Sequence, residues 1–284
     1  MSFHDATCEH LAKYKVDQLR VEENGQFRFR GKNLLKPHIL PIQHRQLNIL
    51  EEYRNRFFDS NHARIKFHRY FHHLNSSQAM CINLFYPLIA ENRLDLVTRF
   101  LGIKSAVNFE PCFEKDSDVE FADRHTSFDF HTRYSKTEEL FVEVKYTEKG
   151  FSKARSDKKH KQKFKDTYDP LVERSPYLAD ICRSEQFFLN HYQVLRNLVH
   201  ISETRQVVLL FPAANSAVAG EADHAYEKML TDAGRTKVKI VRLEKLIAFI
   251  EFECQSDSLA TYYAMFRKKY LPSVVFGVSL LPLI

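Results

Sequence analysis

The sequence predicts an α/β protein built on a mixed β-sheet that is flanked by helices. Residues 126–148 alternate between apolar and polar side chains over two stretches, 126–132 and 140–147, and a polar turn at 135–139 joins them. This alternation is typical of an antiparallel hairpin of half-buried strands. Residues 206–212 (Q-V-V-L-L-F-P) are apolar except at the first position and indicate a strand that is buried on both faces.

The N-terminal part of the chain is expected to be mostly helical after an irregular start. Residues 1–40 show no clear periodicity and end in K-P-H-I-L-P, where two prolines punctuate the chain. A helix should begin at Pro41, because proline favours the first turn and Leu47, Leu50, Tyr53 and Phe57 recur at helical spacing.

A basic and aromatic segment, R-I-K-F-H-R-Y-F-H-H, lies at residues 64–73. His68 and His72 could share a helical face and hold a metal ion. The segment lacks the glutamate of a zinc protease, and the chain has no cysteine pair that would complete a structural site. A partly exposed surface that contacts phosphate is the better interpretation.

The segments before the hairpin predict two helices and one strand. Asn75 or Ser76 should cap a helix that runs to Leu88, and a second helix at 94–101 should end at Gly102. A strand at 107–113 then precedes the hairpin. The loop after it is acidic and could be solvated or supply a further metal carboxylate; its acidic residues are Glu114, Asp116, Asp118, Glu120 and Asp123.

The segments after the hairpin alternate between helix and strand. An amphipathic helix is predicted at 184–200, and a helix at 222–233 should stop at Gly234. A strand at 238–243 follows, so this strand and the one at 206–212 should be parallel with a right-handed crossover. Helices at 244–253 and 259–270 complete the chain before an apolar tail, which should lie against the core or a partner subunit.

Composition restricts the kind of protein. The 284 residues carry a net charge of +6, which is compatible with nucleic acid as a partner without being diagnostic. No apolar window is long enough to span a membrane, and no signal peptide is evident at the start. Five widely spaced cysteines read as reduced thiols, so we expect a cytoplasmic protein. We expect one domain over 1–284, with a mostly helical N-terminal extension at 1–75, a core at 76–254, and a helix and tail at 255–284.

The hairpin concentrates acidic and basic side chains at one place. Phe128 and Phe130 should lie on one face and Asp129 on the other; if the chain turns about Lys136, Asp129 lies opposite Glu143, about 5 Å away. Two carboxylates so close repel each other unless a cation lies between them. A Mg²⁺ ion binds such a pair, and Lys145, two residues after Glu143, could act on water and phosphate. The alternative is an exposed surface on which these charges are solvated.

Asp129 together with Glu143-Val144-Lys145 resembles the PD-(D/E)XK nuclease superfamily. Phe128 stands where the superfamily's proline would be. The flanking segments S-S-Q-A-M-C-I-N-L-F-Y-P-L and Y-Q-V-L-R-N are similar to those of a group of bacterial proteins regarded as restriction endonucleases. The resemblance spans about residues 76–210.

The resemblance implies a restriction-endonuclease-like αβββαβ core and a DNA endonuclease that depends on Mg²⁺, or on Mn²⁺. Asp129 and Glu143 would bind the metal, with the Val144 carbonyl and Glu91, from a preceding helix, as further ligands. Lys145 would orient or help to deprotonate the attacking water. The products would carry 5′-phosphate and 3′-hydroxyl ends.

Basic and polar residues after the hairpin are the candidates for contact with nucleic acid. Basic residues of 149–165 would follow the phosphate backbone, and a Q-x-x-R pattern would lie beside the site. The residues are Lys153, Arg155, Lys158, Lys159, Gln193 and Arg196. A homodimer would let two sites cut both strands of a duplex. The alternatives are a catalytically silent nucleic-acid-binding protein of the same fold and a nuclease for RNA or branched DNA.

Overall fold

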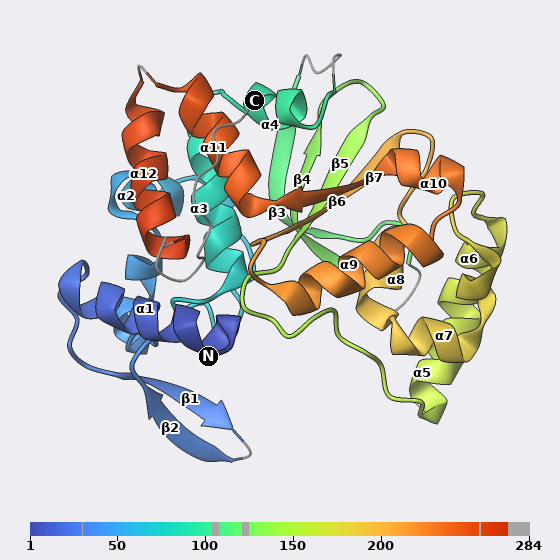
Figure 1. Cartoon of the computed structure of the whole chain (residues 1–284), viewed down its shortest axis with the longest axis horizontal. Helices are drawn as coiled ribbons and strands as arrows, with labels where there is room; N and C mark the ends of the chain where they lie inside the picture. Colours follow the sequence, from blue (N-terminus) through green and yellow to red (C-terminus); the bar gives the residue numbers. More distant parts are fainter. Residues whose placement is uncertain (30, 104–107, 121–124, 256, 272–284) are drawn as a thin grey trace. The chain divides into compact units, whose positions relative to one another are not determined.

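The computed structural model describes residues 1–29, 31–103, 108–120, 125–255 and 257–271, which form two compact units. Unit 1 comprises residues up to Leu96 together with those from Leu243 onward, and unit 2 runs from Val97 to Arg242. The described residues form twelve α-helices and seven strands, so the predicted mixed α/β class is confirmed (Figure 1). The prediction of one domain divided at residues 75 and 254 stays a prediction.

Unit 1 begins with a helix and a small hairpin. Helix α1 (Phe3–Asp17) is capped by the Ser2 hydroxyl, which accepts a hydrogen bond from the Asp5 N–H. Strands β1 (Gly25–Phe29) and β2 (Lys32–Lys36) pair antiparallel. The prediction that residues 1–40 are irregular is therefore wrong. The prediction failed because α1 buries few apolar side chains, among them Leu11 and Tyr14, so its sequence shows little helical periodicity.

The remainder of unit 1 is a group of helices packed around α3 and α12 (Figure 1). These are α2 (Glu51–Phe58), α3 (Ser77–Ala90), α11 (Leu243–Glu253) and α12 (Ser258–Tyr270). The Ser76 side chain caps α3, as predicted. The helix predicted from Pro41 is interrupted: a 3-10 helix spans Ile42–Asn48, and α2 begins only after extended residues. Residues 64–74 form turns rather than a helix, so His68 and His72 share no helical face.

Unit 2 contains a five-stranded mixed sheet in the order β3-β4-β5-β6-β7. The strands are β3 (Glu110–Asp116), β4 (Ser127–Arg133), β5 (Glu139–Val144), β6 (Arg205–Phe211) and β7 (Val238–Arg242). The first three pair antiparallel, and β5, β6 and β7 pair parallel. The predicted hairpin and parallel pair are both confirmed. Of the predicted acidic loop, Glu114 and Asp116 belong to β3, and Asp123 lies outside the described residues.

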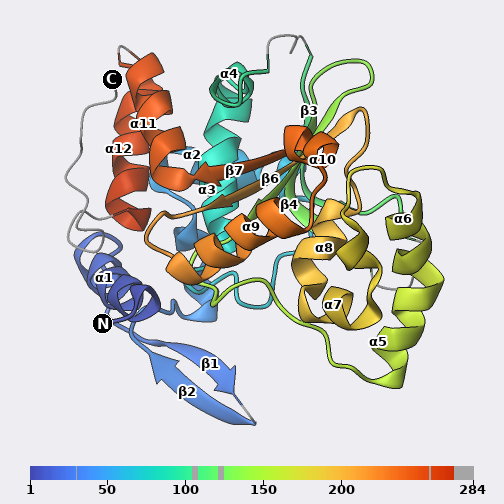
Figure 2. The same ribbon diagram turned by 45° about the vertical axis from the view of Figure 1, so that its right-hand side comes forward.

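The helices of unit 2 that follow β5 pack with one face of this sheet or with one another. They are α5 (Lys158–Lys163), a π-helical turn (Phe164–Tyr168), α6 (Asp169–Arg174), α7 (Glu185–Asn190), α8 (Tyr192–Leu198), α9 (Ser216–Lys228) and α10 (Asp232–Lys237). Helix α9 runs along β6 and β7, with α8 on the same side (Figure 2). A shared core contains Phe141, Phe188, Leu195 and Leu209. Helix α4 (Asp95–Phe100) precedes the sheet in the chain, and Gly102 after it has a φ of +75°, as expected for its terminator.

Two helix predictions in unit 2 fail because tertiary contacts override local pattern. The helix predicted at 184–200 breaks at His191, whose φ and ψ are −121° and 33°, giving α7 and α8. Gly234 does not end a helix but lies inside α10. A Cβ atom there would come within 2.1 Å of the Tyr177 carbonyl oxygen, so close packing explains this glycine.

The regular alternation of β4 is interrupted at Asp129. The rings of Phe128 and His131 both pack on Phe141, with centroids 5.0 and 4.7 Å away, whereas Phe130 packs on Phe113. Phe128 and His131 therefore share a face, and the prediction that Phe128 and Phe130 do so is wrong. The pairing of β3 with β4 keeps one register but omits Glu114 and Asp129 between Phe113↔Phe130 and Lys115↔Phe128, and Glu114 has a φ of +53°. Asp129 lies at this irregular position, and its carboxylate accepts a hydrogen bond from the Val144 N–H of β5.

Within the described part of the chain, no helix combines the length and the apolar character needed to cross a membrane. The apolar tail at 272–284 lies outside the described residues.

Candidate active site

Asp129 lies beside β5 at the end of the hairpin. The strands pair in the register His131↔Phe141 and Phe130↔Val142, and the next residues along the two strands are Asp129 and Glu143. The Val144 N–H donates a hydrogen bond of 2.7 Å to Asp129 Oδ2. One carboxylate oxygen of Asp129 is thus held on the backbone of the strand that carries Glu143.

Glu143 and Lys145 form a buried pair on the same face of β5. Lys145 Nζ donates to Glu143 Oε1 over 2.7 Å, and the two side chains are only 9% and 5% exposed. The Lys145 N–H donates to the Leu210 carbonyl, which continues the parallel pairing with β6. The exposed, solvated pair considered as the alternative is therefore not what the fold contains.

Negative charge exceeds positive charge among these groups. Burial, and next the neighbouring Glu143, raise the pKa of Asp129 well above its ordinary value. Burial alone would lower the pKa of Lys145, but the carboxylates of Glu143, Glu148 and Asp129 raise it, so Lys145 is an ammonium ion. Among the described residues, Lys145 thus lies close to at least three carboxylates, those of Asp129, Glu143 and Glu148. A further cation would relieve this imbalance.

The segment after β5 is fixed by side chains from α8 and α9. Asn215 donates to the carbonyls of Tyr146 and Glu148, each over 2.9 Å, and Glu221 accepts from the Phe151 N–H over 2.7 Å. Gly150 has a φ of +132°, and a Cβ there would meet the Glu221 carboxylate at 2.4 Å. The chain therefore leaves the site along one defined path before the basic residues begin.

Gln193 joins this segment to the site. Its Nε2 donates to Glu143 Oε1 over 3.0 Å, and its Oε1 accepts from the Ser152 N–H over 3.0 Å. Because the second bond fixes which amide atom is the oxygen, the first presents a donor to the carboxylate. Gln193 lies at the start of α8, just after the break at His191. The structure thus brings Gln193 together with Glu143.

Arg196 is not directed at these carboxylates. It forms an ion pair of 3.3 Å with Glu120, whose side chain is completely buried and also accepts hydrogen bonds from Thr126 and Tyr168. The sequence pattern Q-x-x-R therefore combines one residue at the site with one that packs α8 against the segment before β4.

The other predicted residues have contacts and exposure of their own. Glu91, in unit 1, accepts hydrogen bonds from Arg56 over 2.6 Å and Tyr53 over 3.1 Å. The basic residues Lys153, Arg155, Lys158 and Lys159 are exposed around the start of α5. Their roles stay predictions.

Sequence reasoning missed Glu148 and the role of Glu120. Glu148 accepts a hydrogen bond of 2.5 Å from the Tyr146 N–H and raises the pKa of Lys145. It lies outside the period-two pattern, because the chain has left the strand before reaching it. The acidic composition of residues 114–123 drew attention to Glu120, but no local signal pairs it with Arg196.

The donor set at the hairpin suits a hard divalent ion. Asp129 and Glu143 offer carboxylate oxygens, and Val144 between Glu143 and Lys145 offers a carbonyl. Across the described ranges, no cluster of three or more His, Cys, Asp or Glu side chains is arranged to hold a metal. An ion here would therefore take its remaining ligands from backbone, water or substrate, as Mg²⁺ commonly does.

Comparison with known families provides independent information about the chain. No curated protein and no solved structure matches it. The model of one family, described as Restriction Endonuclease associating with ARP, matches residues 9–271, nearly the whole chain. This match confirms the resemblance to restriction endonucleases. The chain belongs to the family of restriction endonucleases associating with ARP.

Proposed function

We propose that this protein is a metal-dependent endonuclease of the PD-(D/E)XK type that hydrolyses phosphodiester bonds in DNA. The observation that carries the proposal is the convergence of Asp129, Glu143 and Lys145 from two adjacent strands. Membership of a restriction endonuclease family supports nuclease activity. The order of the elements, three antiparallel strands followed by helices and a parallel strand, supports an αβββαβ core.

Asp129, Glu143 and the Val144 carbonyl would hold Mg²⁺ or Mn²⁺. When bound, such an ion supplies a Lewis acid that polarises a phosphate oxygen and acidifies a water molecule. Glu91 is a further candidate ligand. Gln193 positions the Glu143 carboxylate through its hydrogen bond of 3.0 Å.

Lys145 would orient the attacking water and stabilise negative charge on the phosphate. The raised pKa of Lys145 favours this role over proton abstraction, because an ammonium ion has no lone pair to accept a proton. The water oxygen forms a bond to phosphorus while the bond from phosphorus to O3′ breaks. The products are a 5′-phosphate and a 3′-hydroxyl group.

The exposed basic residues would contact the DNA backbone. Their charge attracts phosphates without regard to sequence, and so positions the strand. The residues are Lys153, Arg155, Lys158 and Lys159, all exposed where the chain has left the site. In a homodimer, two such sites would cut both strands of a duplex.

Cleavage of supercoiled plasmid in Mg²⁺ tests the proposal. Glu143→Gln and Lys145→Ala should each reduce the nicking rate at least about 100-fold, because the first removes a metal ligand and the second removes positive charge that stabilises the scissile phosphate. Glu227→Gln and Lys228→Ala are matched controls on the exposed face of α9 and should cleave like the wild type. Equal cleavage by all four variants would assign the nuclease activity to another site or to a contaminant.

A catalytically silent nucleic-acid-binding protein is the second candidate. The observation that favours it is the buried hydrogen bond from Lys145 to Glu143 Oε1, which already occupies one oxygen of a carboxylate that would bind the metal. It predicts DNA binding that weakens with salt and no cleavage in any divalent ion. Competition among duplex, single-stranded, branched and RNA substrates separates a DNA endonuclease from a nuclease for RNA or branched DNA.

A further inference from the structure

A cavity of about 640 Å³ lies within unit 1, and none of its lining residues belongs to the candidate active site. Its walls come from α1, from Phe27 and Lys36 of the β1–β2 hairpin, from the segment after β2, and from the turn at Tyr70–Asn75. The volume is within the range of about 300–1000 Å³ that is usual for small-molecule pockets.

Aromatic rings line one side of the cavity. The Phe27 ring lies edge-on to Tyr70 and His73, with centroids 5.6 and 5.7 Å away, and Tyr70 lies 4.7 Å from His73 at 31°. The His38 ring is edge-on to His73, with centroids 6.5 Å apart. The Arg69 guanidinium lies over the Tyr70 ring, 4.5 Å from its centroid. The rings, gathered from three segments, offer their remaining surfaces to a planar ligand.

His73 supplies a polar group that the protein leaves unsatisfied. The residue is 8% exposed, and its Nε2 has no hydrogen-bond partner in the described part of the chain. Its backbone is fixed, because the Asn48 amide donates to the His73 carbonyl over 2.7 Å. A buried nitrogen without a partner costs free energy, and a ligand that bonds to it removes that cost.

The other polar groups of the cavity restrict the ligand further. Burial lowers the pKa of His38 to about 4 and of His73 to about 3, so both rings are neutral near pH 7 and can each donate and accept. Burial raises the pKa of Cys8 to about 11, so Cys8 remains a thiol. The described residues provide no metal cluster of three such ligands here. The exposed carboxylates of Asp5 and Glu9 disfavour an anionic ring.

We propose that this cavity binds a single heteroaromatic base of the kind found in nucleosides. A purely apolar ligand would leave His73 Nε2 unsatisfied, whereas a planar ring with donors and acceptors on its edge satisfies it and stacks on Tyr70. The base can come from a free nucleoside or nucleotide, whose phosphate Lys36 could contact, or from a nucleotide turned out of a DNA strand. The basic and aromatic segment at 64–73 thereby contributes a base-binding wall.

Calorimetry on the full-length protein in EDTA tests this binding without cleavage. The first series uses the four deoxynucleosides and their 5′-monophosphates. The second compares a single-stranded oligonucleotide with one of equal length that lacks all bases. Both make the same phosphate contacts, so the difference in their binding free energies reports the bases alone. We expect at least one base-containing ligand to bind with a stoichiometry of one.

Three variants locate the binding. Tyr70→Ala should weaken base binding about tenfold or more, which is the usual effect of removing a stacking ring. His73→Phe keeps the ring and its volume, and should weaken binding about fivefold through the lost hydrogen bond. Phe252→Ala removes an exposed ring on α11 and should change nothing. Thermal unfolding verifies that each variant is folded.

The two series separate the sources of the base and can also overturn the proposal. Binding of free nucleosides identifies a small-molecule ligand. A second result identifies a base supplied by DNA: free nucleosides do not bind, the oligonucleotide with bases binds more tightly than the abasic one, and Tyr70→Ala removes this difference in affinity. If neither series shows base-dependent binding, or if Tyr70→Ala and His73→Phe bind like the wild type, the proposal is wrong. Because no cleavage is measured, this outcome is independent of nuclease activity.

Discussion

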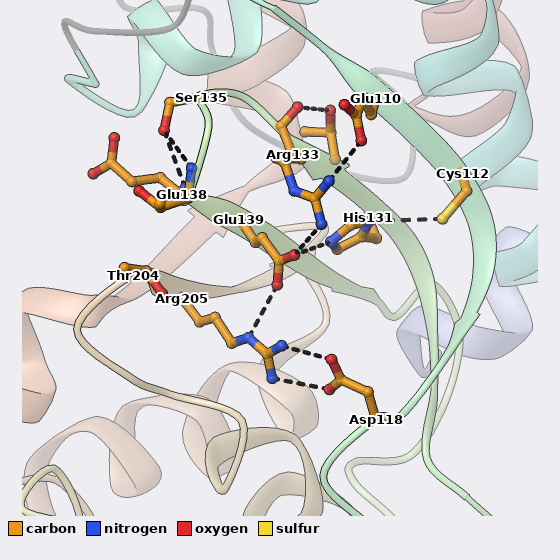
Figure 3. A network of polar contacts seen from close by, with 12 residues as sticks. Glu110, Cys112, Asp118, His131, Arg133, Ser135, Glu138, Glu139, Thr204 and Arg205 are labelled. Atoms are coloured by element: carbon orange, nitrogen blue, oxygen red, sulfur yellow. Dashed lines mark hydrogen bonds and ion pairs between the residues drawn. The ribbon is translucent and has the colours of Figure 1, made fainter.

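The two ends of the β4–β5 hairpin both bury charged groups, but they treat them differently. At the end near the turn, Glu139 is bonded to Arg133 over 3.2 Å and to Arg205 over 3.0 Å (Figure 3). Arg205 also binds both oxygens of Asp118, over 2.9 and 2.6 Å, and Arg133 binds Glu110 over 2.9 Å. The carboxylates of Glu139, Asp118 and Glu110 therefore each contact a guanidinium group.

At the opposite end, the carboxylates of Asp129, Glu143 and Glu148 all act on the ammonium group of Lys145. The directions of the pKa shifts express this difference. Burial alone would raise the pKa of Asp118, but its bonds to Arg205 lower it, whereas the pKa of Asp129 is raised. A satisfied network stabilises a fold, and an unsatisfied one offers a place for a ligand. The comparison predicts that substitutions at the two ends will separate stability from activity.

Asp129→Asn should show the largest effect. The amide cannot replace a carboxylate as a metal ligand, so cleavage should fall at least about 1000-fold. Its oxygen can still accept the hydrogen bond from Val144, and the repulsion with Glu143 disappears. The free energy of unfolding in the absence of metal should therefore rise by about 1 kcal/mol, measured by urea denaturation. A variant that is both inactive and less stable would contradict the view that this end is strained for function.

Arg205→Ala should have the opposite effect. It leaves Glu139, only 12% exposed, with fewer partners, so the free energy of unfolding should fall by about 2 kcal/mol. The cleavage rate of the folded fraction should remain near that of the wild type. Arg183→Ala, which removes an exposed ion pair with Asp180, is the matched control and should change stability by less than about 0.5 kcal/mol. Loss of activity in folded Arg205→Ala would mean that the two ends are coupled.

The sequence predicted more of the Asp129 end of the hairpin than of the Glu139 end. The period-two pattern was enough to locate β4 and β5 and the register that brings Asp129 to Glu143. It did not predict that the alternation breaks at Asp129. The Phe128 ring packs on Phe141, and this tertiary contact places Phe128 on the face opposite to the one that a regular strand would give it. It assigned no partner to Arg205, since its contacts with Asp118 and Glu139 span 87 and 66 positions of the chain.

The same limit explains which parts of the candidate site were found. The motif residues lie within 17 positions of one another, so local pattern sufficed. The bond from Gln193 to Glu143 depends on how α8 begins after the break at His191, which is a consequence of tertiary packing. The cavity of unit 1 arises where residues of α1 meet the hairpin and the turn at residues 70–75, and the first 40 residues had shown no periodicity to indicate that helix.

The pH dependence should also distinguish the two ends. Metal binding requires the ionised form of Asp129, whose pKa is raised, so Mg²⁺ affinity should strengthen as pH rises, by up to about tenfold per unit below that pKa. Calorimetric titration of Mg²⁺ from about pH 5 to 8 measures this slope, and Asp129→Asn should abolish it. A wild-type affinity that does not change with pH would contradict the raised pKa.

Stability without metal should depend on pH with opposite signs at the two ends. Because the pKa of Asp129 is raised by folding, its contribution to stability is fully present below the unfolded pKa and is lost as pH rises through the folded pKa. Asp118 has a lowered pKa, so its contribution is present above the unfolded pKa and is lost as pH falls through the folded one. The free energy of unfolding should be measured against pH for both variants. Asp129→Asn should lose the decrease in stability with rising pH, and Asp118→Asn should lose the decrease with falling pH.

Gln193→Leu should have the smallest effect of the series. Leucine keeps the volume of the side chain but removes the donor to Glu143 and the acceptor for the Ser152 N–H. The Glu143 carboxylate then keeps the hydrogen bond from Lys145 but loses the one from residue 193. We expect cleavage to slow about fivefold, since a single neutral hydrogen bond that positions a charged group is worth about 1 kcal/mol. Gln186→Leu, at an exposed position of α7, is the matched control. Cleavage rates measured over a range of Mg²⁺ concentrations show whether Gln193 positions the metal ligand or only stabilises the fold. Loss of a positioning residue should raise the Mg²⁺ concentration needed for half-maximal cleavage, so that excess metal partly restores the rate. Loss of a purely structural residue would lower stability and leave that concentration unchanged.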